Sequence, residues 1–246
     1  MIEVRHLSHI FPDGTTALHD INLRINEGEF VVLAGANGSG KTVLTRHFNG
    51  LLSPTEGEVL IDGTNIHDAP MTARQKVGLI FQNVDSQIVA QTVMEDASFG
   101  PENLGLPQSE VERRAREALQ AVGLEGYDHK DPRTLSGGQK RRLAIAGVLA
   151  MNPRVLVLDE PFVGLDLAGV KCVLGQIVSL HHQGHTIVLV THELEKCLAH
   201  ATRLIVLSEG RKVLDGTPAE TVTRIEEFGL RNPIHEGLAL ESLTWL

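Results

Sequence analysis

The sequence predicts an α/β fold: a mostly parallel sheet covered by helices, with an N-terminal antiparallel β subdomain and a helical insertion. Short β-rich apolar runs recur along the 246 residues and alternate with helical patterns, which is the order typical of a parallel sheet. The run at residues 30–34 is continuously apolar, as expected of a strand that is buried on both faces. The other predicted strands of this sheet are residues 77–80, 155–158, 187–190 and 204–207.

The antiparallel subdomain is predicted from the first part of the chain. Ile21, Leu23 and Ile25 alternate with polar residues, and this period of two indicates a half-buried strand. Residues 12–14, Pro-Asp-Gly, predict a turn before that strand.

The helical insertion is predicted at about residues 85–150, and its clearest helix covers residues 109–122. Ser109 and Glu112 have the spacing of a capping box. Apolar residues three and four positions apart form one face of this helix. They are Val111, Ala115, Ala118, Leu119 and Val122.

Composition excludes several classes of protein. Hydrophobic residues make up 42% of the chain, charged residues 22%, and the formal net charge is −9, whereas bulk nucleic-acid binding favours a basic face. The longest run of apolar residues and glycines, residues 143–151, is much shorter than the about 20 residues of a membrane-spanning helix. We see no signal peptide. The isolated Cys172 and Cys197 fit a reducing cytoplasm and form no zinc ribbon.

A phosphate-binding loop follows the first buried strand. Residues 35–42 match the pattern GxxxxGK[ST] between this strand and a helix that is expected to open near Lys41. Glycines let backbone N–H groups surround a triphosphate, and the start of the helix adds a positive dipole end. We expect Lys41 to contact the β- and γ-phosphates and the Thr42 hydroxyl to bind Mg²⁺. The predicted nucleotide-binding residues of this loop are Gly35, Asn37, Gly38, Ser39, Gly40, Lys41 and Thr42.

A second buried strand, residues 155–158, ends in two carboxylates, those of Asp159 and Glu160. Ligands of α/β folds bind at the carboxyl ends of the strands. We expect Asp159 to hold Mg²⁺ and Glu160 to orient and polarise the attacking water. Together with the loop, this strand predicts a site that hydrolyses a nucleoside triphosphate.

A second phosphate-binding helix start lies at residues 135–139, Leu-Ser-Gly-Gly-Gln. Ser136 can cap a helix over residues 137–150, and the glycine-rich start of that helix favours an anion. This motif resembles the signature of ABC-type ATPases, and the resemblance covers about residues 2–217. It implies the ABC ATPase fold with a P-loop NTPase core. It also implies a head-to-tail dimer in which the signature of one subunit closes the ATP site of the other. The signature residues are Ser136, Gly137, Gly138 and Gln139.

The same resemblance implies roles for four further residues. Gln82 would reach Mg²⁺ and the attacking water and would sense a membrane partner. His192 would contact the γ-phosphate, and Asp166 would lie in a loop at the dimer interface. Phe11 occupies the position of an aromatic residue that stacks on adenine, for which a π-face is sufficient.

Residues 77–89 and 92–104 closely resemble the ATPases of energy-coupling-factor importers, a group that takes up cobalt, nickel, biotin and other vitamins. The resemblance implies a groove for a helix of a transmembrane coupling component, a substrate-capture membrane protein as a further partner, and a place at the cytoplasmic face of the membrane. Glu95 and Asp96 would offer carboxylates to an arginine of that helix. A homodimer and a heterodimer with a related ATPase both remain open.

We interpret residues 1–217 as the ATPase domain and residues 218–246 as a short helical tail. Three histidines at residues 181–185 suggest a metal site, but their setting is more typical of a surface helix end and turn, with Gly184 near the C-cap.

The preferred function is ATP hydrolysis that drives uptake of a metal ion or a vitamin. The first alternative is a soluble ABC ATPase that acts on nucleic acid or ribosomes, whose activity would fall steeply with salt. The second is a P-loop kinase of small molecules, which leaves Ser136 to Gln139 unexplained.

Overall fold

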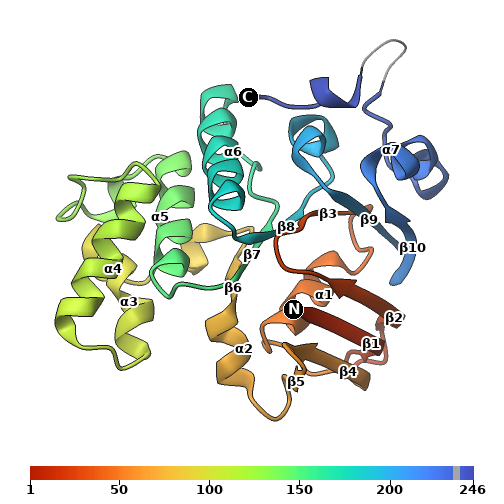
Figure 1. The fold of residues 1–246 in the computed structure, drawn as a ribbon, viewed down its shortest axis with the longest axis horizontal. Helices are drawn as coiled ribbons and strands as arrows, with labels where there is room; N and C mark the ends of the chain where they lie inside the picture. Colours follow the sequence, from red (N-terminus) through yellow and green to blue (C-terminus); the bar gives the residue numbers. More distant parts are fainter. Residues whose placement is uncertain (235–238) are drawn as a thin grey trace.

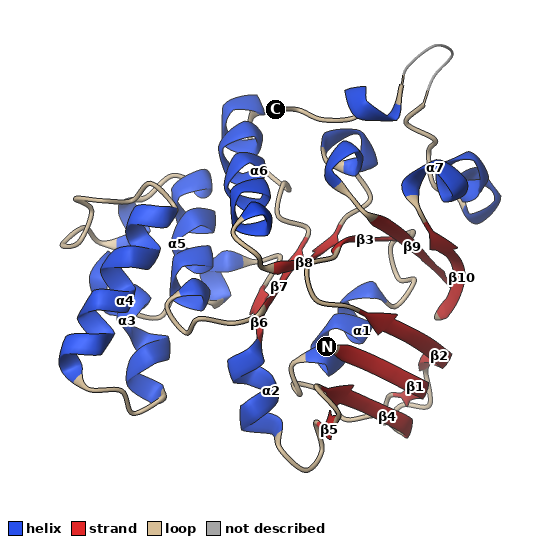
Figure 2. Ribbon diagram, viewed as in Figure 1, coloured by secondary structure: helices blue, strands red, loops and turns tan. Residues whose placement is uncertain are grey.

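The computed structural model describes residues 1–234 and 239–246, which form two sheets and seven α-helices (Figures 1 and 2). The first sheet is antiparallel and has the order β2-β1-β4-β5. Its strands are β1 (Ile2–Ile10), β2 (Thr16–Ile25), β4 (Glu56–Ile61) and β5 (Thr64–Asn65). This sheet confirms the antiparallel strands expected near the N-terminus.

The second sheet has the order β10-β9-β3-β8-β7-β6, and the antiparallel edge strand β10 is its exception to parallel pairing. The predicted strands of this sheet are confirmed to within one residue at either end. They are β3 (Phe30–Ala34), β6 (Val77–Ile80), β7 (Val155–Asp159), β8 (Thr186–Val190) and β9 (Arg203–Ser208). The edge strand β10 (Arg211–Gly216) was not predicted.

Strand β3 shows why its sequence is continuously apolar. Phe30 and Val32 face a core that includes α5 (Gly137–Leu149) and α6 (Leu167–His182), whereas Val31 and Leu33 face a second core between the two sheets. Both faces are therefore buried, and an alternating pattern would have placed polar groups in one of the cores.

Helix α1 (Lys41–Phe48) begins at the predicted residue and buries Leu44 and Phe48 in the core between the sheets. Helices α3, α4 and α5 lie together beyond the β6 edge (Figure 1). The remaining helices are α2 (Pro70–Lys76), α3 (Val93–Asn103), α4 (Gln108–Ala121), α5 (Gly137–Leu149), α6 (Leu167–His182) and α7 (Pro218–Thr221). None of the helices described here is both long and apolar enough to cross a membrane.

Helix α4 confirms the predicted apolar face but corrects its start. Val111, Ala115, Ala118 and Leu119 are buried, yet the helix begins at Gln108 after Pro107, and no side chain caps it. The fixed φ of Pro107 suits a helix start, so Ser109 already lies inside the first turn. The capping box expected at Ser109 and Glu112 is therefore wrong.

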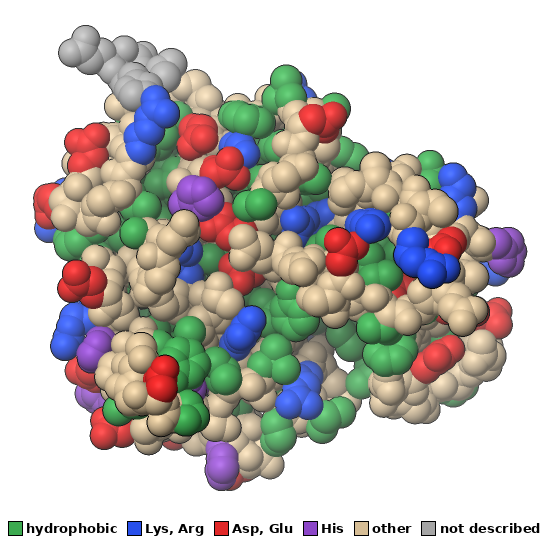
Figure 3. Space-filling model, turned by 180° about the vertical axis from the view of Figure 1, so that it is seen from behind, with side chains coloured by type: hydrophobic (Ala, Val, Ile, Leu, Met, Phe, Trp, Pro, Cys, Tyr) green, Lys and Arg blue, Asp and Glu red, His purple; other side chains and the backbone are tan. Residues whose placement is uncertain are grey.

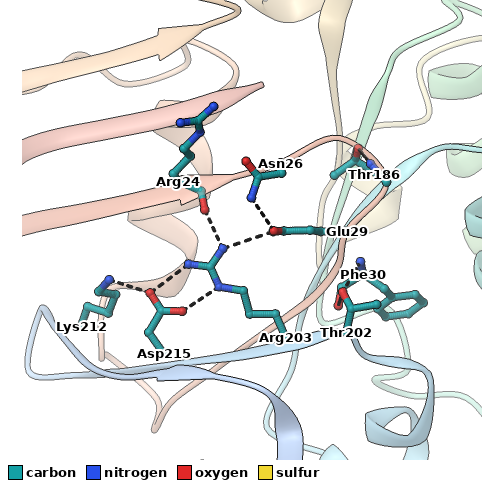
Figure 4. Close-up of polar contacts among 10 residues, drawn as sticks. Arg24, Asn26, Glu29, Phe30, Thr186, Thr202, Arg203, Lys212 and Asp215 are labelled. Atoms are coloured by element: carbon teal, nitrogen blue, oxygen red, sulfur yellow. Dashed lines mark hydrogen bonds and ion pairs between the residues drawn. The ribbon is translucent and has the colours of Figure 1, made fainter.

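The two sheets are joined by a polar network around Arg203 of β9 (Figure 4). Its guanidinium donates to the Arg24 carbonyl of β2 at 2.6 Å and to Glu29 at 3.2 Å. It also pairs with Asp215 of β10 at 2.7 Å, and Lys212 donates to the same carboxylate at 2.6 Å. The network ties β2 of the first sheet to β9 and β10 of the second.

Candidate functional site

A cavity of about 670 Å³ opens at the carboxyl ends of the parallel strands. Lys41 follows β3, Gln82 follows β6, Asp159 ends β7 and His192 follows β8. Neighbouring parallel strands end at the same edge of a sheet, which brings these side chains together although they are far apart in sequence. The predicted residues that line the cavity are Phe11, Asn37, Gly38, Ser39, Gly40, Lys41, Thr42, Gln82, Asp159, Glu160 and His192.

The phosphate-binding loop depends on close backbone contacts. A Cβ atom on Gly35 would lie 2.4 Å from the Leu207 carbonyl, and one on Gly40 would lie 2.8 Å from the Ala17 carbonyl. Gly40 also has a φ of 99° as the N-cap of α1, a conformation that other residues adopt at a cost. Only glycine fits these two positions without displacing the neighbouring strands.

The Lys41 ammonium donates to the carbonyls of Gly35 at 2.7 Å and Ala36 at 3.0 Å. Burial lowers the pKa of Lys41, and the nearby carboxylates of Glu160 and Asp159 oppose this shift. A buried cation at the start of a helix is well placed to bind an anion that enters the cavity.

Thr42 and Asp159 lie in contact: the Thr42 hydroxyl donates to Asp159 Oδ2 at 2.8 Å. Burial raises the pKa of Asp159, and the charge of Glu160 adds to this effect. Asp159 Oδ1 is buried and has no hydrogen-bond partner among the described residues. A hydroxyl beside a carboxylate with an unpaired oxygen fits Mg²⁺, which takes oxygen ligands and commonly uses one or two carboxylates together with substrate phosphates.

Glu160 and His192 form the other polar pair of the cavity. His192 Nδ1 lies 2.8 Å from Glu160 Oε1. Glu160 Oε2 is buried, and no described group forms a hydrogen bond with it. Glu160 therefore keeps one carboxylate oxygen available to accept a proton from a bound water.

Gln82 is held through its backbone by a residue that the sequence reasoning missed. Arg141 of α5 is buried and donates to the carbonyls of Gln82 at 2.8 Å and Phe81 at 3.1 Å. Burial lowers the pKa of Arg141, and Asp159 and Asp85 oppose the shift. The local sequence around Arg141, five residues after Ser136, does not predict this role, because the contact with Gln82 spans about 60 residues of sequence.

Ser136 caps α5 as predicted, in a capping box with Gln139. These residues do not line the Lys41 cavity. They line a separate hollow of about 470 Å³ together with Gly137, Gly138 and Asp166. Asp166 Oδ1 accepts a hydrogen bond from the Gly169 amide at 2.7 Å and caps α6. One chain thus carries two distinct helix starts, each of which lines its own hollow.

The histidines near residue 181 end α6. Helix α6 stops at His182, and Gly184 has a φ of 100°. His181 and His185 contact the backbone carbonyls of Gly28 and Pro153. Within residues 1–234 and 239–246, no three histidine, cysteine, aspartate or glutamate side chains are grouped so as to hold a metal ion.

Residues 18–163 match the family model of ABC transporters, which is more than half of the chain. The chain belongs to the ABC transporter family. The family match shows that this ABC protein is an ATPase that binds a nucleotide. The match therefore favours an ABC ATPase over a small-molecule kinase as the protein that carries this phosphate-binding loop.

Close relatives of this ABC ATPase are named energy-coupling-factor transporter ATP-binding proteins. The chain is 48% identical over 235 residues to EcfA of Methanocaldococcus jannaschii, with 94% of this chain and 84% of the relative covered. It is 45% identical over 245 residues to EcfA2 of Clostridium perfringens, with 94% and 86% covered. The predicted likeness to the energy-coupling-factor ATPases is confirmed.

Solved structures confirm the ABC ATPase fold. CbiO1 of Clostridium perfringens, described as part of the ABC transporter complex CbiONQ, matches with a TM-score of 0.83 and 39% identity over 92% of both chains. A dimeric bacterial ABC transporter cassette matches with a TM-score of 0.78 and 31% identity, and covers 88% of this chain and 98% of that one.

Proposed function

We propose that this chain is the ATP-hydrolysing subunit of an importer of the energy-coupling-factor type. Two copies, or one copy and a related ATPase, would close head to tail around ATP and drive uptake of a metal ion such as cobalt or nickel, or of a vitamin. The observation that supports this proposal is the separation of the Lys41 cavity from the Ser136 hollow within one chain. A triphosphate that must meet both helix starts needs the second one from another subunit.

The residues of the cavity suit in-line hydrolysis of the γ-phosphate. Lys41 would exchange its two carbonyl contacts for the phosphate oxygens. Glu160 Oε2 would take a proton from the attacking water, whose oxygen forms the new bond to phosphorus as the bond to the β-phosphate oxygen breaks. His192 would contact the γ-phosphate, and through Nδ1 it would also hold the other oxygen of Glu160 and so keep the carboxylate oriented.

Thr42, Asp159 and Gln82 are the residues that would hold Mg²⁺. When bound, the ion offsets the charge of the β- and γ-phosphate oxygens. Closure of the dimer depends on contacts that exist only while the γ-phosphate is present, so its loss on hydrolysis would reopen the dimer.

A groove of about 420 Å³ between α2 and α3 is proposed to receive a helix of the transmembrane coupling component. Four large apolar side chains around it are 44–60% exposed, and such patches commonly mark partner surfaces. They are Leu51, Met71, Val89 and Phe99. Figure 3 shows hydrophobic side chains gathered where the α3–α5 lobe meets the rest of the molecule.

Asp96 lines this groove, and its Oδ1 accepts from the backbone N–H groups of Val89 and Ala90 at 2.9 and 3.2 Å. Burial raises the pKa of this carboxyl. Glu95 instead closes the capping box of α3 with Thr92. We therefore propose that Asp96, and not Glu95, pairs with an arginine of the coupling helix. The docked chain would lie at the cytoplasmic face of the membrane, beside a substrate-capture protein.

Cys172 provides a test of the head-to-tail dimer. Its thiol lies in the Ser136 hollow and is exposed, whereas Cys197 is buried, so a maleimide should modify Cys172 selectively. In the Glu160→Gln variant we expect ATP with Mg²⁺ to slow this modification and to double the mass in solution. ADP should do neither, and Lys41→Ala in the same background is the control.

Three outcomes would count against the proposal. Unchanged labelling of Cys172 together with a monomeric mass in ATP would show that the proposed dimer does not form. ATP hydrolysis stimulated by DNA or RNA would favour the nucleic-acid alternative. If the Phe99→Asp variant still copurifies with integral membrane proteins, the groove between α2 and α3 is not the docking surface.

A further inference from the structure

Two buried histidines contact each other between β1 and α1, and no step of the proposed hydrolysis uses them. His9 of β1 is 8% exposed and His47 of α1 is fully buried. His9 Nδ1 lies 3.2 Å from His47 Nε2, and His47 Nδ1 lies 2.7 Å from the Val43 carbonyl. Burying two imidazoles is unfavourable unless their nitrogens are hydrogen-bonded. An apolar pair would fill this space at lower cost, so the histidines call for a separate explanation.

The hydrogen bonds define where the protons lie. A carbonyl can only accept, so His47 Nδ1 carries a proton and donates to Val43. Burial lowers the pKa of His47 to about 4, although the carbonyls of Val43 and Ser53 favour the charged form. His47 is therefore neutral near pH 7, and its Nε2 is an acceptor. His9 Nδ1 must then be the donor in the bond between the two rings.

The histidine pair contacts Phe11, which lines the proposed nucleotide cavity. The His9 ring contacts the Phe11 ring edge to face, with centroids 4.8 Å apart and planes at 82°. Phe11 lies beyond the end of β1, in a turn closed by its backbone bonds with Thr15 and Gly14. Among the described residues, His9 is the ring in direct aromatic contact with Phe11.

We propose that His9 and His47 are positioning residues that hold the Phe11 ring in register with the phosphate-binding helix α1. The series Val43–His47–His9–Phe11 links the helix that begins at Lys41 to an aromatic ring that lines the same cavity. The base and the triphosphate of one ATP are then bound by two parts of the chain with a fixed separation. This inference rests on the proposed stacking of Phe11 on adenine.

The test compares ATP with inorganic tripolyphosphate, which has no base. In His9→Asn the amide retains a donor but the ring is lost. We expect the KM for ATP to rise about 2- to 10-fold, the range of an edge-to-face aromatic contact, with kcat at saturating ATP retained. Inhibition by tripolyphosphate should be unchanged. His67→Ala, an exposed histidine outside the cavity, is the control.

A double-mutant cycle with Phe11→Ala separates the two proposals. If His9 acts through Phe11, His9→Asn should add nothing to the Phe11→Ala effect. Additive effects, or a KM for ATP unchanged in His9→Asn, overturn the positioning role. Equal weakening of ATP and tripolyphosphate also overturns it, because that pattern indicates general loosening of the site. If Phe11→Ala itself leaves ATP affinity unchanged, the proposed adenine stacking fails, and the inference fails with it.

Discussion

Glu160 owes its position to residues on two neighbouring strands. It directly follows β7, and its backbone N–H donates to the Val190 carbonyl at the end of β8 at 2.9 Å. Its φ is 47°, a left-handed conformation that is strained for a residue with a Cβ atom. Strain of this kind is concentrated at functional sites, where the surrounding structure maintains it. Here it turns the carboxylate towards His192 and the phosphate-binding loop.

Glu160→Gln removes a proton acceptor but preserves the size of the side chain. We expect turnover to fall by roughly 10²–10⁴, the usual contribution of a general base, while ATP affinity is retained. Phosphate release and equilibrium nucleotide binding measure the two quantities. Glu209→Gln is a matched control, because Glu209 is an exposed glutamate that also has a positive φ of 49°. Normal turnover in Glu160→Gln would remove this residue from its proposed role.

Helix α5 connects two functions at the scale of an element. Its first turn presents the Ser136 capping box, and one turn later Arg141 reaches the backbone of Gln82. The same helix therefore touches both the signature hollow and the Gln82 side of the ATP cavity. A shift of α5 against β6 would move both, which suits a domain that must couple nucleotide binding to a partner.

Arg141→Met should lower both turnover and stability. The carbonyls of Phe81 and Gln82 would lose a charged donor, which costs about 1–3 kcal/mol of unfolding free energy, and Gln82 would lose its anchor. Arg203→Met is the comparison, because Arg203 also donates to a backbone carbonyl, that of Arg24, and lines neither the Lys41 cavity nor the Ser136 hollow. Urea unfolding and kcat should show similar stability losses but a larger fall in turnover for Arg141→Met. Equal turnover in the two variants would argue against the anchor.

At the scale of the whole molecule, the Arg203 network holds the two sheets together (Figure 4). Partial burial alone raises the pKa of Asp215, but hydrogen bonds from Arg203 and Lys212 outweigh it and hold that pKa below its ordinary value of 3.8. A carboxyl with a lowered folded-state pKa stabilises the fold above its unfolded pKa. That stabilisation is lost as the pH falls through the folded pKa.

Asp215→Asn should therefore reduce the unfolding free energy at pH 7 by about 1.5–3 kcal/mol, as expected for hydrogen bonds to a charged group. The difference from the parent chain should shrink below about pH 4, where the parent carboxyl begins to take up a proton. Urea unfolding at several pH values measures it. A difference that stays constant down to pH 3 would show that the charge of Asp215 does not contribute.

The end of the chain shows a limit of local prediction. Short helical turns occur at Val222–Phe228 and Leu240–Ser242, within the predicted helical tail. The last residues instead dock on the segment after His192. The Trp245 amide donates to the Lys196 carbonyl, and the Lys196 ammonium lies 4.6 Å from the Trp245 ring centroid. The division of the chain at residue 217 stays a prediction.

Local sequence was sufficient for the parallel strands of the second sheet and for the position of the phosphate-binding loop. A buried strand, a glycine loop and a helix start each depend on backbone conformations within a few residues, so residues 30–42 and 155–160 could be located from their patterns alone. The register of parallel strands then brings their ends together. Ser109 is the exception, because the preceding Pro107 began the helix earlier than its capping pattern indicated.

Tertiary structure alone decided the contacts between distant parts of the chain. The hydrogen bonds from Arg141 to the Gln82 backbone and the series of contacts from His47 through His9 to Phe11 both join residues on different elements. Such contacts depend on how helices and sheets pack. A single sequence carries the residues that make them but no periodic signal of which distant residue each will meet.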